Sequence, residues 1–229
     1  MGLSEQMILP FEDRVDHEIE SFIPAASNQH AFDWIGRWPD WPFTAMVLVG
    51  PAGSGKTHLA SLWRKNSKAA SVDLADAGIE QAAALTAGGE PVLVEDCDRV
   101  LDETQAERTL LQLYNLAKAS GSRLLLTARR APSQWRLRLP DLESRLNSAM
   151  VVAIDPADDE LLRKVVVKLF EDKQVEVKEE LFAYLLLRCE RTVSRVAQAV
   201  ETLNRISKER QRPITVPMAR EVLFQSDDD

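Results

Sequence analysis

The apolar positions of this 229-residue chain follow two patterns, one before and one after residue 155. In the first part, short apolar runs of strand length alternate with longer segments of helical periodicity. The runs cover residues 46–49, 69–74, 92–94, 123–127 and 149–154. Strands that alternate with helices predict a parallel sheet with helices on both of its faces. The pattern therefore predicts a three-layer α/β domain.

The clearest helical segment of this part covers residues 104–120. Its apolar residues recur at helical spacing and form one face: Leu110, Leu113, Tyr114 and Ala117. Thr104 and Glu107 have the T-x-x-E spacing of a capping box, which predicts the start of the helix. Gly121 predicts its end.

After Asp155 and Pro156 the strand pattern stops, and only helical segments follow. They cover residues 158–173, 178–189, 192–210 and 218–224. Pro217 suits the first turn of the last helix. The sequence predicts a small all-α domain over residues 156–225 and a disordered acidic tail over residues 226–229.

Composition and charge restrict the class of protein. Apolar residues make up 45% of the chain and charged residues 28%, which is typical of a globular protein. A net charge of −8 argues against a surface that binds nucleic acid all over, although a local basic patch is compatible with it.

The sequence predicts a cytoplasmic protein with no membrane partner. No apolar run approaches the ~18 residues that span a bilayer, and Glu5 lies where a secretory signal has basic residues. Cys97 and Cys189 lie far apart in the sequence, and we expect both to be free, buried thiols.

Residues Gly50 to Thr57, GPAGSGKT, match the P-loop pattern G-x-x-x-x-G-K-[ST] at every required position. A predicted strand precedes them and a helical pattern follows, as this motif requires. The glycines allow backbone N–H groups to face phosphates, and the helix start is positive. We predict that Lys56 reaches the β- and γ-phosphates of ATP or ADP and that Thr57 holds Mg²⁺. The predicted nucleotide-binding residues here are Gly50, Gly53, Ser54, Gly55, Lys56, Thr57 and His58.

Two acids follow the predicted strand 92–94. Glu95 and Asp96 are expected beside the nucleotide, where a P-loop protein places acids that act on the metal and on water. We predict a catalytic role for both and a metal-binding role for Glu95. The alternative is that the two acids only begin a loop.

Three further stretches carry a resemblance to a known family: ASNQHAF at 26–32, PDLESRL at 140–146 and RTVSRVAQAVETL at 191–203. With the P-loop, they resemble the DnaA-related branch of the AAA+ family, and within it the Hda-like regulatory inactivators of DnaA. The resemblance covers residues 11–224. It implies an AAA+ nucleotide-binding domain over residues 12–155 and a helical lid domain over residues 156–225.

The resemblance also implies roles for single residues. Arg145 is expected to be an arginine finger that acts in trans, and Arg195 the lid arginine that senses bound nucleotide. Asn28 is expected near the adenine. From the residues alone, both arginines could be ordinary surface charges, and His30 could be a surface residue. A positive side chain at a helix start opposes the helix dipole, which a phosphate beside Arg195 would explain.

Residues 1–11 are predicted to form a clamp-binding peptide. Gln6-Met-Ile-Leu-Pro-Phe11 resembles the Gln-led peptides that dock into the sliding clamp, the beta subunit of DNA polymerase III. Gln6 would form hydrogen bonds while Leu9 and Phe11 fill an apolar slot. The alternative is that Leu9 and Phe11 pack on the protein's own core.

The expected function is a clamp-associated regulator of replication initiation that promotes hydrolysis of DnaA-bound ATP. The expected partners are DnaA and the clamp, with self-association as a further possibility. The helix-turn-helix domain of DnaA has no counterpart in this sequence, so we expect no sequence-specific DNA binding. The order Glu95-Asp96, and Arg129 where DnaA has an Asp, predict weak or no intrinsic ATPase, with ADP as the bound nucleotide.

Two other functions stay open: an AAA+ ATPase or loader that acts on nucleic acid, and a nucleotide-binding clamp adaptor without action on DnaA. Trp34, Trp38 and Trp41 suit core packing better than stacking on single-stranded DNA.

Residues 123–145 carry a local charge of +4, with arginine as the only basic residue type. We expect this segment to form the edge that faces a partner, unless its side chains point in different directions. Its arginines are Arg123, Arg129, Arg130, Arg136, Arg138 and Arg145.

Overall fold

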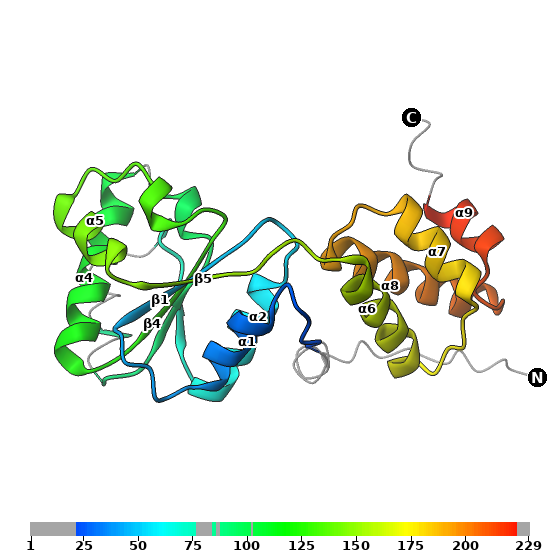
Figure 1. Cartoon of the computed structure of the whole chain (residues 1–229), viewed down its shortest axis with the longest axis horizontal. Coiled ribbons are helices and arrows are strands. Elements are labelled where there is room, and N and C mark those ends of the chain that lie inside the picture. Colours follow the sequence, from blue (N-terminus) through cyan, green and yellow to red (C-terminus); the bar gives the residue numbers. More distant parts are fainter. Residues whose placement is uncertain (1–21, 77–83, 86–87, 102, 224–229) are drawn as a thin grey trace, which may run out of the picture.

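The computed structural model describes residues 22–76, 84–85, 88–101 and 103–223. The predicted clamp-binding residues Gln6, Leu9 and Phe11 and the predicted acidic tail lie outside these ranges. Figure 1 shows two units, a sheet with helices on both faces and a separate group of helices. They correspond to the predicted α/β domain and the predicted lid.

Five parallel strands form the sheet in the order β2-β3-β4-β1-β5. Their bounds are Ala45–Val49 for β1, Ala70–Val72 for β2, Val92–Val94 for β3, Leu124–Ala128 for β4 and Met150–Ala153 for β5. Each lies within a predicted run or within one residue of it. Because the strands are parallel, the P-loop after β1 and the acids after β3 emerge at the same edge of the sheet, with only β4 between these two strands.

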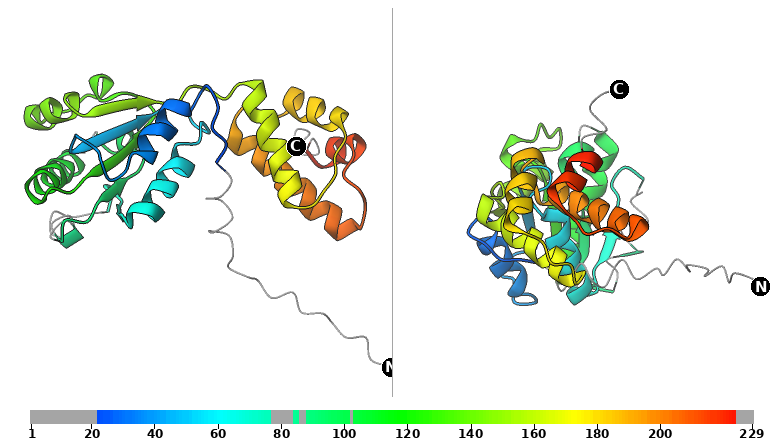
Figure 2. Two further views of the ribbon diagram at one scale, coloured as in Figure 1. Left: turned by 60° about the horizontal axis from the view of Figure 1, so that its bottom comes forward. Right: turned by 90° about the vertical axis from the view of Figure 1, so that its right-hand side faces the viewer.

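Helices cover both faces of the sheet. Helices α1 (Gln29–Gly36) and α2 (Lys56–Ser67) lie on one face, and α4 (Thr104–Ser120) and α5 (Pro140–Asn147) lie on the other (Figures 1 and 2). Two short 3₁₀ helices, η1 (Cys97–Arg99) and η2 (Pro132–Gln134), follow β3 and β4. The predicted three-layer α/β arrangement is confirmed.

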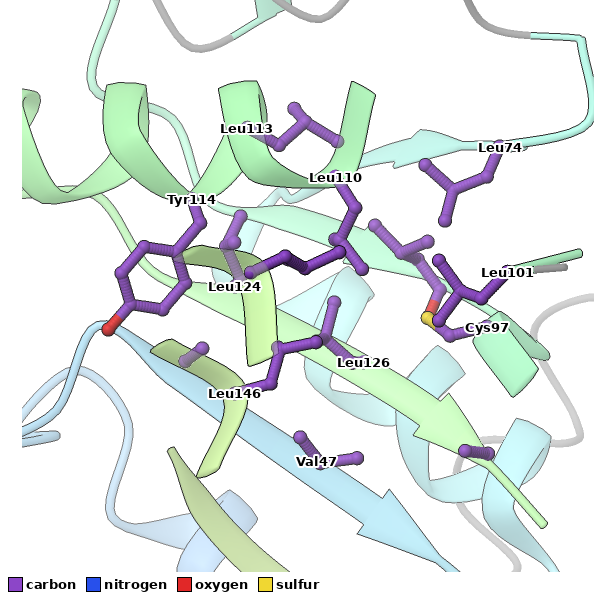
Figure 3. Close-up of a cluster of buried hydrophobic side chains, with 14 of the residues drawn as sticks. Val47, Leu74, Cys97, Leu101, Leu110, Leu113, Tyr114, Leu124, Leu126 and Leu146 are labelled. Carbon is purple, nitrogen blue, oxygen red and sulfur yellow. The ribbon is translucent and has the colours of Figure 1, made fainter. Parts of the chain in front are cut away.

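Alternate residues of β1 belong to different hydrophobic clusters, one on each face. Val47 and Val49 pack in the cluster that contains α4 and α5, part of which is drawn in Figure 3. Met46 and Leu48 pack in the cluster that contains α1 and α2. All five residues of β1 are buried, which explains why the strand is apolar throughout.

The predicted core role of the tryptophans is confirmed. Trp41 is 2% exposed, stacks on Trp63 with ring centroids 5.3 Å apart, and donates its indole N–H to the carbonyl of Trp34. Trp34 and Trp38 are partly buried against the same cluster. Of the two free cysteines, Cys97 is fully buried as expected, while Cys189 is only half-buried.

The predicted capping box of α4 is wrong. Glu103 is the N-cap residue, without a side-chain capping bond, and Thr104 is the first helical residue. Glu107 is 0% exposed, and its carboxylate accepts hydrogen bonds from the backbone of Arg138 and Leu139. Its partners lie 31 and 32 residues away in the sequence, beyond the reach of a local pattern. Gly121 ends α4 in the left-handed conformation, as predicted.

The second unit contains the predicted lid helices. They are α6 (Asp159–Asp172), α7 (Glu179–Arg188), α8 (Val193–Arg210) and α9 (Val216–Leu223), which share a hydrophobic cluster of their own. The side chains of Asp158 and Thr192 cap α6 and α8 by accepting backbone N–H bonds. Within the described ranges, no helix has the length and apolar character that crossing a bilayer requires.

Candidate nucleotide-binding site

The P-loop connects β1 to α2 as the motif predicts. Gly53 and Gly55 have φ angles of 73° and 97°, which L side chains rarely adopt, and Gly55 is the N-cap residue of α2. Lys56 begins the helix and turns back under the loop, where its Nζ donates to the carbonyls of Gly50 and Pro51, both at 2.8 Å. These bonds hold the ammonium group at the inner side of the loop.

Two of the glycines lie against other segments. A Cβ on Gly50 would lie 2.6 Å from the carbonyl oxygen of Ile154, directly after β5. A Cβ on Gly53 would lie 2.6 Å from the Cβ of Thr192, at the start of α8. The loop is therefore enclosed between the end of β5 and the lid.

Electrostatics at the loop favour an anionic ligand. Burial lowers the pKa of Lys56 from its ordinary value of 10.5; the negative charge of Asp96 opposes this effect, and the positive charge of Arg129 adds to it. The Oγ of Ser54 is buried and has no hydrogen-bond partner among the described residues. An orphaned hydroxyl and a desolvated ammonium beside a helix start fit a phosphate group.

A cavity of about 530 Å³ opens at the loop and is large enough for a nucleotide. The α/β domain contributes Phe22, Ile23, Asn28, Ala52, Gly53, Ser54, Gly55, Lys56, Thr57, His58, Ser61, Asp96 and Arg129. The lid contributes Leu161, Val165, Lys168 and Leu169 from α6, and Val193, Ser194 and Ala197 from α8. The cavity is thus built from both units, with mostly apolar residues on the lid side and mostly polar residues at the P-loop.

Most of the predicted nucleotide-binding residues line this cavity. They are Asn28, Gly53, Ser54, Gly55, Lys56, Thr57 and His58, together with the predicted acid Asp96. Gly50 lies behind the loop, where its carbonyl accepts the Lys56 bond. Glu95 is half-buried but is not among the lining residues, whereas Asp96 lines the cavity together with Thr57.

Asn28 shapes the wall of the cavity through its own hydrogen bonds. Its Oδ1 accepts from the backbone N–H of Ala25 at 2.8 Å, and its Nδ2 donates to the carbonyl of Ile23 at 3.1 Å. The nearby Phe22 ring stacks on Phe32 and contacts the His58 ring edge-to-face. Asn28 therefore holds the segment that presents an aromatic ring to the cavity. His30 is exposed and lies outside the lining, in line with its alternative as a surface residue.

Arg195 points to its own helix start and not to the cavity. Its Nε lies 3.2 Å from the carboxylate of Glu190, and its Nη1 donates to Gln198. Neighbouring Val193 and Ser194 line the cavity instead. In this conformation the positive charge near the start of α8 has Glu190 as its partner, and Arg195 is not among the residues that line the cavity.

The acids after β3 connect neighbouring strand ends. Asp96 has a φ of 50°, its N–H donates to the Oγ1 of Thr127 in β4, and its carboxylate pairs with Arg99 at 3.1 Å. The side chain of Asp98, 4% exposed, accepts backbone N–H bonds from Arg129 and Arg130. Asp98 thereby fixes the segment that brings Arg129 to the cavity.

Sequence reasoning did not assign a role to Asp98, although it follows Asp96 by two residues. Lys168 was also missed. It lines the cavity from the same face of α6 as Leu161 and Val165, and its Nζ pairs with Asp172 at 3.0 Å. The helical spacing of that face identified an amphipathic helix, but spacing alone does not distinguish a face that covers a core from one that closes a cavity.

Arg145 lies on α5 and is not among the residues that line the cavity. Its guanidinium lies over the ring of Tyr114, 5.5 Å from the centroid. The Nε is buried and has no hydrogen-bond partner, and no acid among the described residues forms an ion pair with it. Arg145 is therefore half-buried in its own domain, and its positive charge has no counter-ion among the residues that the structure describes.

The arginines of residues 123–145 do not form one surface. Arg123, at the start of β4, donates to the carbonyls of Trp41, Gly121 and Ser122, whereas Arg129 lies beyond the other end of the strand. Arg130 and Arg136 line a separate cavity of about 220 Å³ with Asp98, Leu101, Gln134 and Trp135. The expectation of a single partner-facing edge is corrected to several smaller sites, because the segment runs from one end of the sheet to the other.

Comparison with known proteins gives matches over the lid and over the whole chain. Residues 159–223 match the family model of the Hda lid domain. The chain is 30% identical to an uncharacterized protein of Haemophilus influenzae over 96% of this chain and 99% of that protein.

Solved structures of replication proteins share the fold. Domain III of the replication initiation protein DnaA from Thermotoga maritima matches with a TM-score of 0.76 and 17% identity, over 93% of this chain and 98% of that chain. AMPPCP-bound DnaA from Aquifex aeolicus matches with a TM-score of 0.66 and 17% identity, over 84% of this chain and 68% of that chain. At these identities the likeness concerns the fold alone.

Proposed function

The chain belongs to the Hda-like, DnaA-related AAA+ proteins, and from this premise we propose that it promotes hydrolysis of DnaA-bound ATP by presenting Arg145 to the nucleotide of DnaA. The family membership supports a role as a DnaA-related regulator. Arg145, in the stretch PDLESRL, supplies the group that acts on the partner's nucleotide.

The location of Arg145 is the main support for an action in trans. The residue lies on α5, outside the lining of its own nucleotide cavity. In Figure 1, α5 is at the end of the α/β domain that is far from the lid, whereas the cavity lies between that domain and the lid. A guanidinium that no described acid pairs with is suited to an anion on another molecule. In P-loop systems such a group accelerates phosphoryl transfer by ~10³- to 10⁵-fold.

The protein's own nucleotide has a structural role in this proposal. ADP or ATP binds between the P-loop and the lid, with Lys56 and Ser54 at the phosphates and Thr57 and Asp96 as candidate Mg²⁺ ligands. Arg129 brings a positive charge to the cavity at the position where DnaA carries an Asp. We therefore expect tight binding of ADP with weak or no turnover.

The N-terminal peptide tethers the protein to the sliding clamp in this proposal. Gln6, Leu9 and Phe11 would dock into a clamp pocket, which raises the effective concentration of the regulator near DNA. No base contact is required for this effect. Removal of residues 1–11 should therefore lower the stimulated hydrolysis of DnaA-bound ATP when this protein is present at a limiting concentration. The chemistry of Arg145 should be unchanged.

One experiment tests the proposal. ATP-loaded cognate DnaA is incubated with clamp-loaded DNA and this protein, and the hydrolysis of the DnaA-bound nucleotide is measured. We expect stimulation by the wild type, loss of about 10³-fold or more of the stimulated rate for Arg145→Ala, and partial loss for Arg145→Lys, which keeps the charge but not the forked donor geometry. Arg220→Ala on α9, an exposed arginine of the lid, is the matched control and should act like wild type.

Other outcomes identify the alternative functions. If Arg145→Ala stimulates hydrolysis of the DnaA-bound nucleotide as strongly as the wild type does, the finger role is contradicted. Clamp and nucleotide binding without any effect on DnaA would indicate an adaptor. Strong intrinsic hydrolysis that single-stranded DNA stimulates would indicate a nucleic-acid motor or loader.

A further inference from the structure

Two buried side chains of α4 hold the helix that carries Arg145, and we propose that Glu107 and Tyr114 are positioning residues for the arginine finger. This inference rests on the proposed function, because it concerns how the same guanidinium reaches its target. Neither residue is expected to touch the partner's nucleotide. Both act through the placement of α5 (Pro140–Asn147).

Glu107 fixes the backbone where α5 begins. Its Oε1 accepts from the N–H of Arg138 at 2.9 Å, and its Oε2 accepts from the N–H groups of Arg138 and Leu139 at 3.0 and 2.8 Å. Leu139 is the N-cap residue of α5 and supplies no side-chain capping bond. The carboxylate of Glu107 takes that place from a neighbouring helix, at the positive end of α5.

A side-chain bond adds a second connection at the same point. The Nη1 of Arg138 donates to the Oγ1 of Thr104 at 3.1 Å, in the first turn of α4. The peptide before α5 is thus bonded to two residues of α4 that lie three positions apart. This arrangement restricts both translation and rotation of the chain where it enters α5.

Tyr114 holds the other end of α5. It follows Glu107 by seven residues and so lies on the same face of α4. Figure 3 shows its ring projecting from α4 toward the segment that carries Leu146. The guanidinium of Arg145 lies over this ring, at a distance that fits a cation–π contact. Glu107 and Tyr114 therefore contact the beginning and the last turn of a helix of only eight residues.

The burial of Glu107 indicates a purpose beyond packing. Its carboxylate is 0% exposed, and no basic side chain in the described part of the chain pairs with it. A buried charge destabilises a core unless hydrogen bonds compensate it, and an apolar residue would pack there without that penalty. What the carboxylate supplies, and an apolar residue does not, is a fixed position for the N–H groups before α5.

Placement matters because an arginine finger acts over a short distance. A displacement of about 1 Å can lower a rate by about 10²-fold even when the altered residue is remote from the chemistry. The ring of Tyr114 also limits the conformations of Arg145, so less conformational freedom is lost when the partner docks. Loss of either contact should therefore lower the catalysed rate more than it weakens docking.

The test measures hydrolysis of ATP on DnaA as a function of the concentration of this protein. Glu107→Gln replaces one acceptor oxygen by an NH₂ group that faces backbone N–H donors, and Tyr114→Leu removes the ring. We expect each to lower the maximal rate by about 10- to 100-fold, with a change of less than about threefold in the half-saturating concentration. Tyr114→Phe keeps the ring and is the matched control, with a rate near that of wild type.

The same substitutions in an Arg145→Ala background show whether they act through the finger. We expect no further loss there, because the group that they position is absent. A further loss would overturn the inference and assign a general structural role. The affinity of the protein's own cavity for nucleotide serves as a control for correct folding. It should equal that of the wild type in every variant. If Glu107→Gln fails this check, the Tyr114→Leu and Tyr114→Phe pair decides.

The outcomes separate this inference from the proposed function. If Arg145→Ala alone stimulates DnaA like wild type, the proposed function fails. If Arg145→Ala is inactive while folded Glu107→Gln and Tyr114→Leu keep the wild-type maximal rate, only the positioning role fails.

Discussion

At the scale of single residues, Lys56 combines burial with charges of both signs. Burial lowers its pKa from the ordinary value of 10.5. The negative charge of Asp96 opposes this shift, and the positive charge of Arg129 adds to it. A bound phosphate favours the protonated ammonium form. Nucleotide binding is therefore coupled to proton uptake wherever the free protein has partly deprotonated Lys56.

We expect nucleotide affinity to fall as the pH rises toward 10.5, beginning below this value because the pKa is lowered. Calorimetric titration with ADP from neutral pH upward measures the effect. Lys56→Ala should bind about tenfold or more weakly at neutral pH, ~1.4 kcal/mol, and should lack this alkaline decline. A constant wild-type affinity up to pH 10.5 would contradict the prediction.

Residues of a contiguous motif were predictable from the sequence, whereas residues that act across the sheet were not. The P-loop residues around Lys56 are adjacent in the chain, so their spacing alone defines the phosphate site. Asp98 acts on the backbone of Arg129 and Arg130, more than 30 residues away, and Glu107 on that of Arg138. Local spacing carries no information on such partners, and for Glu107 it predicted a capping role that the fold does not use.

At the scale of elements, the close approach of the P-loop to α8 connects phosphate binding to the lid. Gly53 has a φ of 73° and faces Thr192, the N-cap residue of α8. A methyl group there would require a shift of the loop or of the helix start. A larger residue at position 53 would therefore alter the contact between the P-loop and the lid helix.

We expect Gly53→Ala to destabilise the protein by about 1–3 kcal/mol and to weaken nucleotide binding, because it adds both a strained φ and a clash with Thr192. Thermal unfolding with and without ADP measures both effects. Gly36→Ala is the matched control. A Cβ on Gly36, the last residue of α1, meets no atom within 4 Å, so its stability should be unchanged or higher by up to about 1 kcal/mol. Equal behaviour of the two variants would refute the clash.

Helix and strand positions were predictable because their periodicities are strong. The helical segment 192–210 corresponds to α8 (Val193–Arg210), and the run 92–94 to β3 without change. The order of strands in the sheet is a different matter. The sequence predicted no strand order, because pairing joins β1 to β4 across most of the α/β domain and no local pattern reports such a pairing.

At the scale of the whole molecule, the nucleotide cavity is shared by two units with separate hydrophobic clusters. A ligand that contacts both walls binds only when both are folded and in place. At a concentration of 100 times its dissociation constant, such a ligand adds about 2.7 kcal/mol to stability. Part of this effect must appear in the lid.

We expect ADP to slow hydrogen exchange in α6 and α8, which line the cavity, as well as in the P-loop. Helix α9, which lies on the far side of the lid in Figure 1 and is not part of the lining, should change little. Exchange measured by mass spectrometry with and without ADP checks this. Protection confined to the P-loop and α2 would contradict a two-sided site.

The segment between β5 and α6 matters for any chimera that exchanges lids between relatives. The carbonyl of Ile154 lies directly against Gly50, and the N–H of Asp155 donates to Ser27 at 2.9 Å. Both residues thus belong to the nucleotide-binding unit, although they follow its last strand. A crossover point after Asp155 keeps these contacts native, whereas one at the end of β5 would join the donor's linker to a foreign phosphate loop.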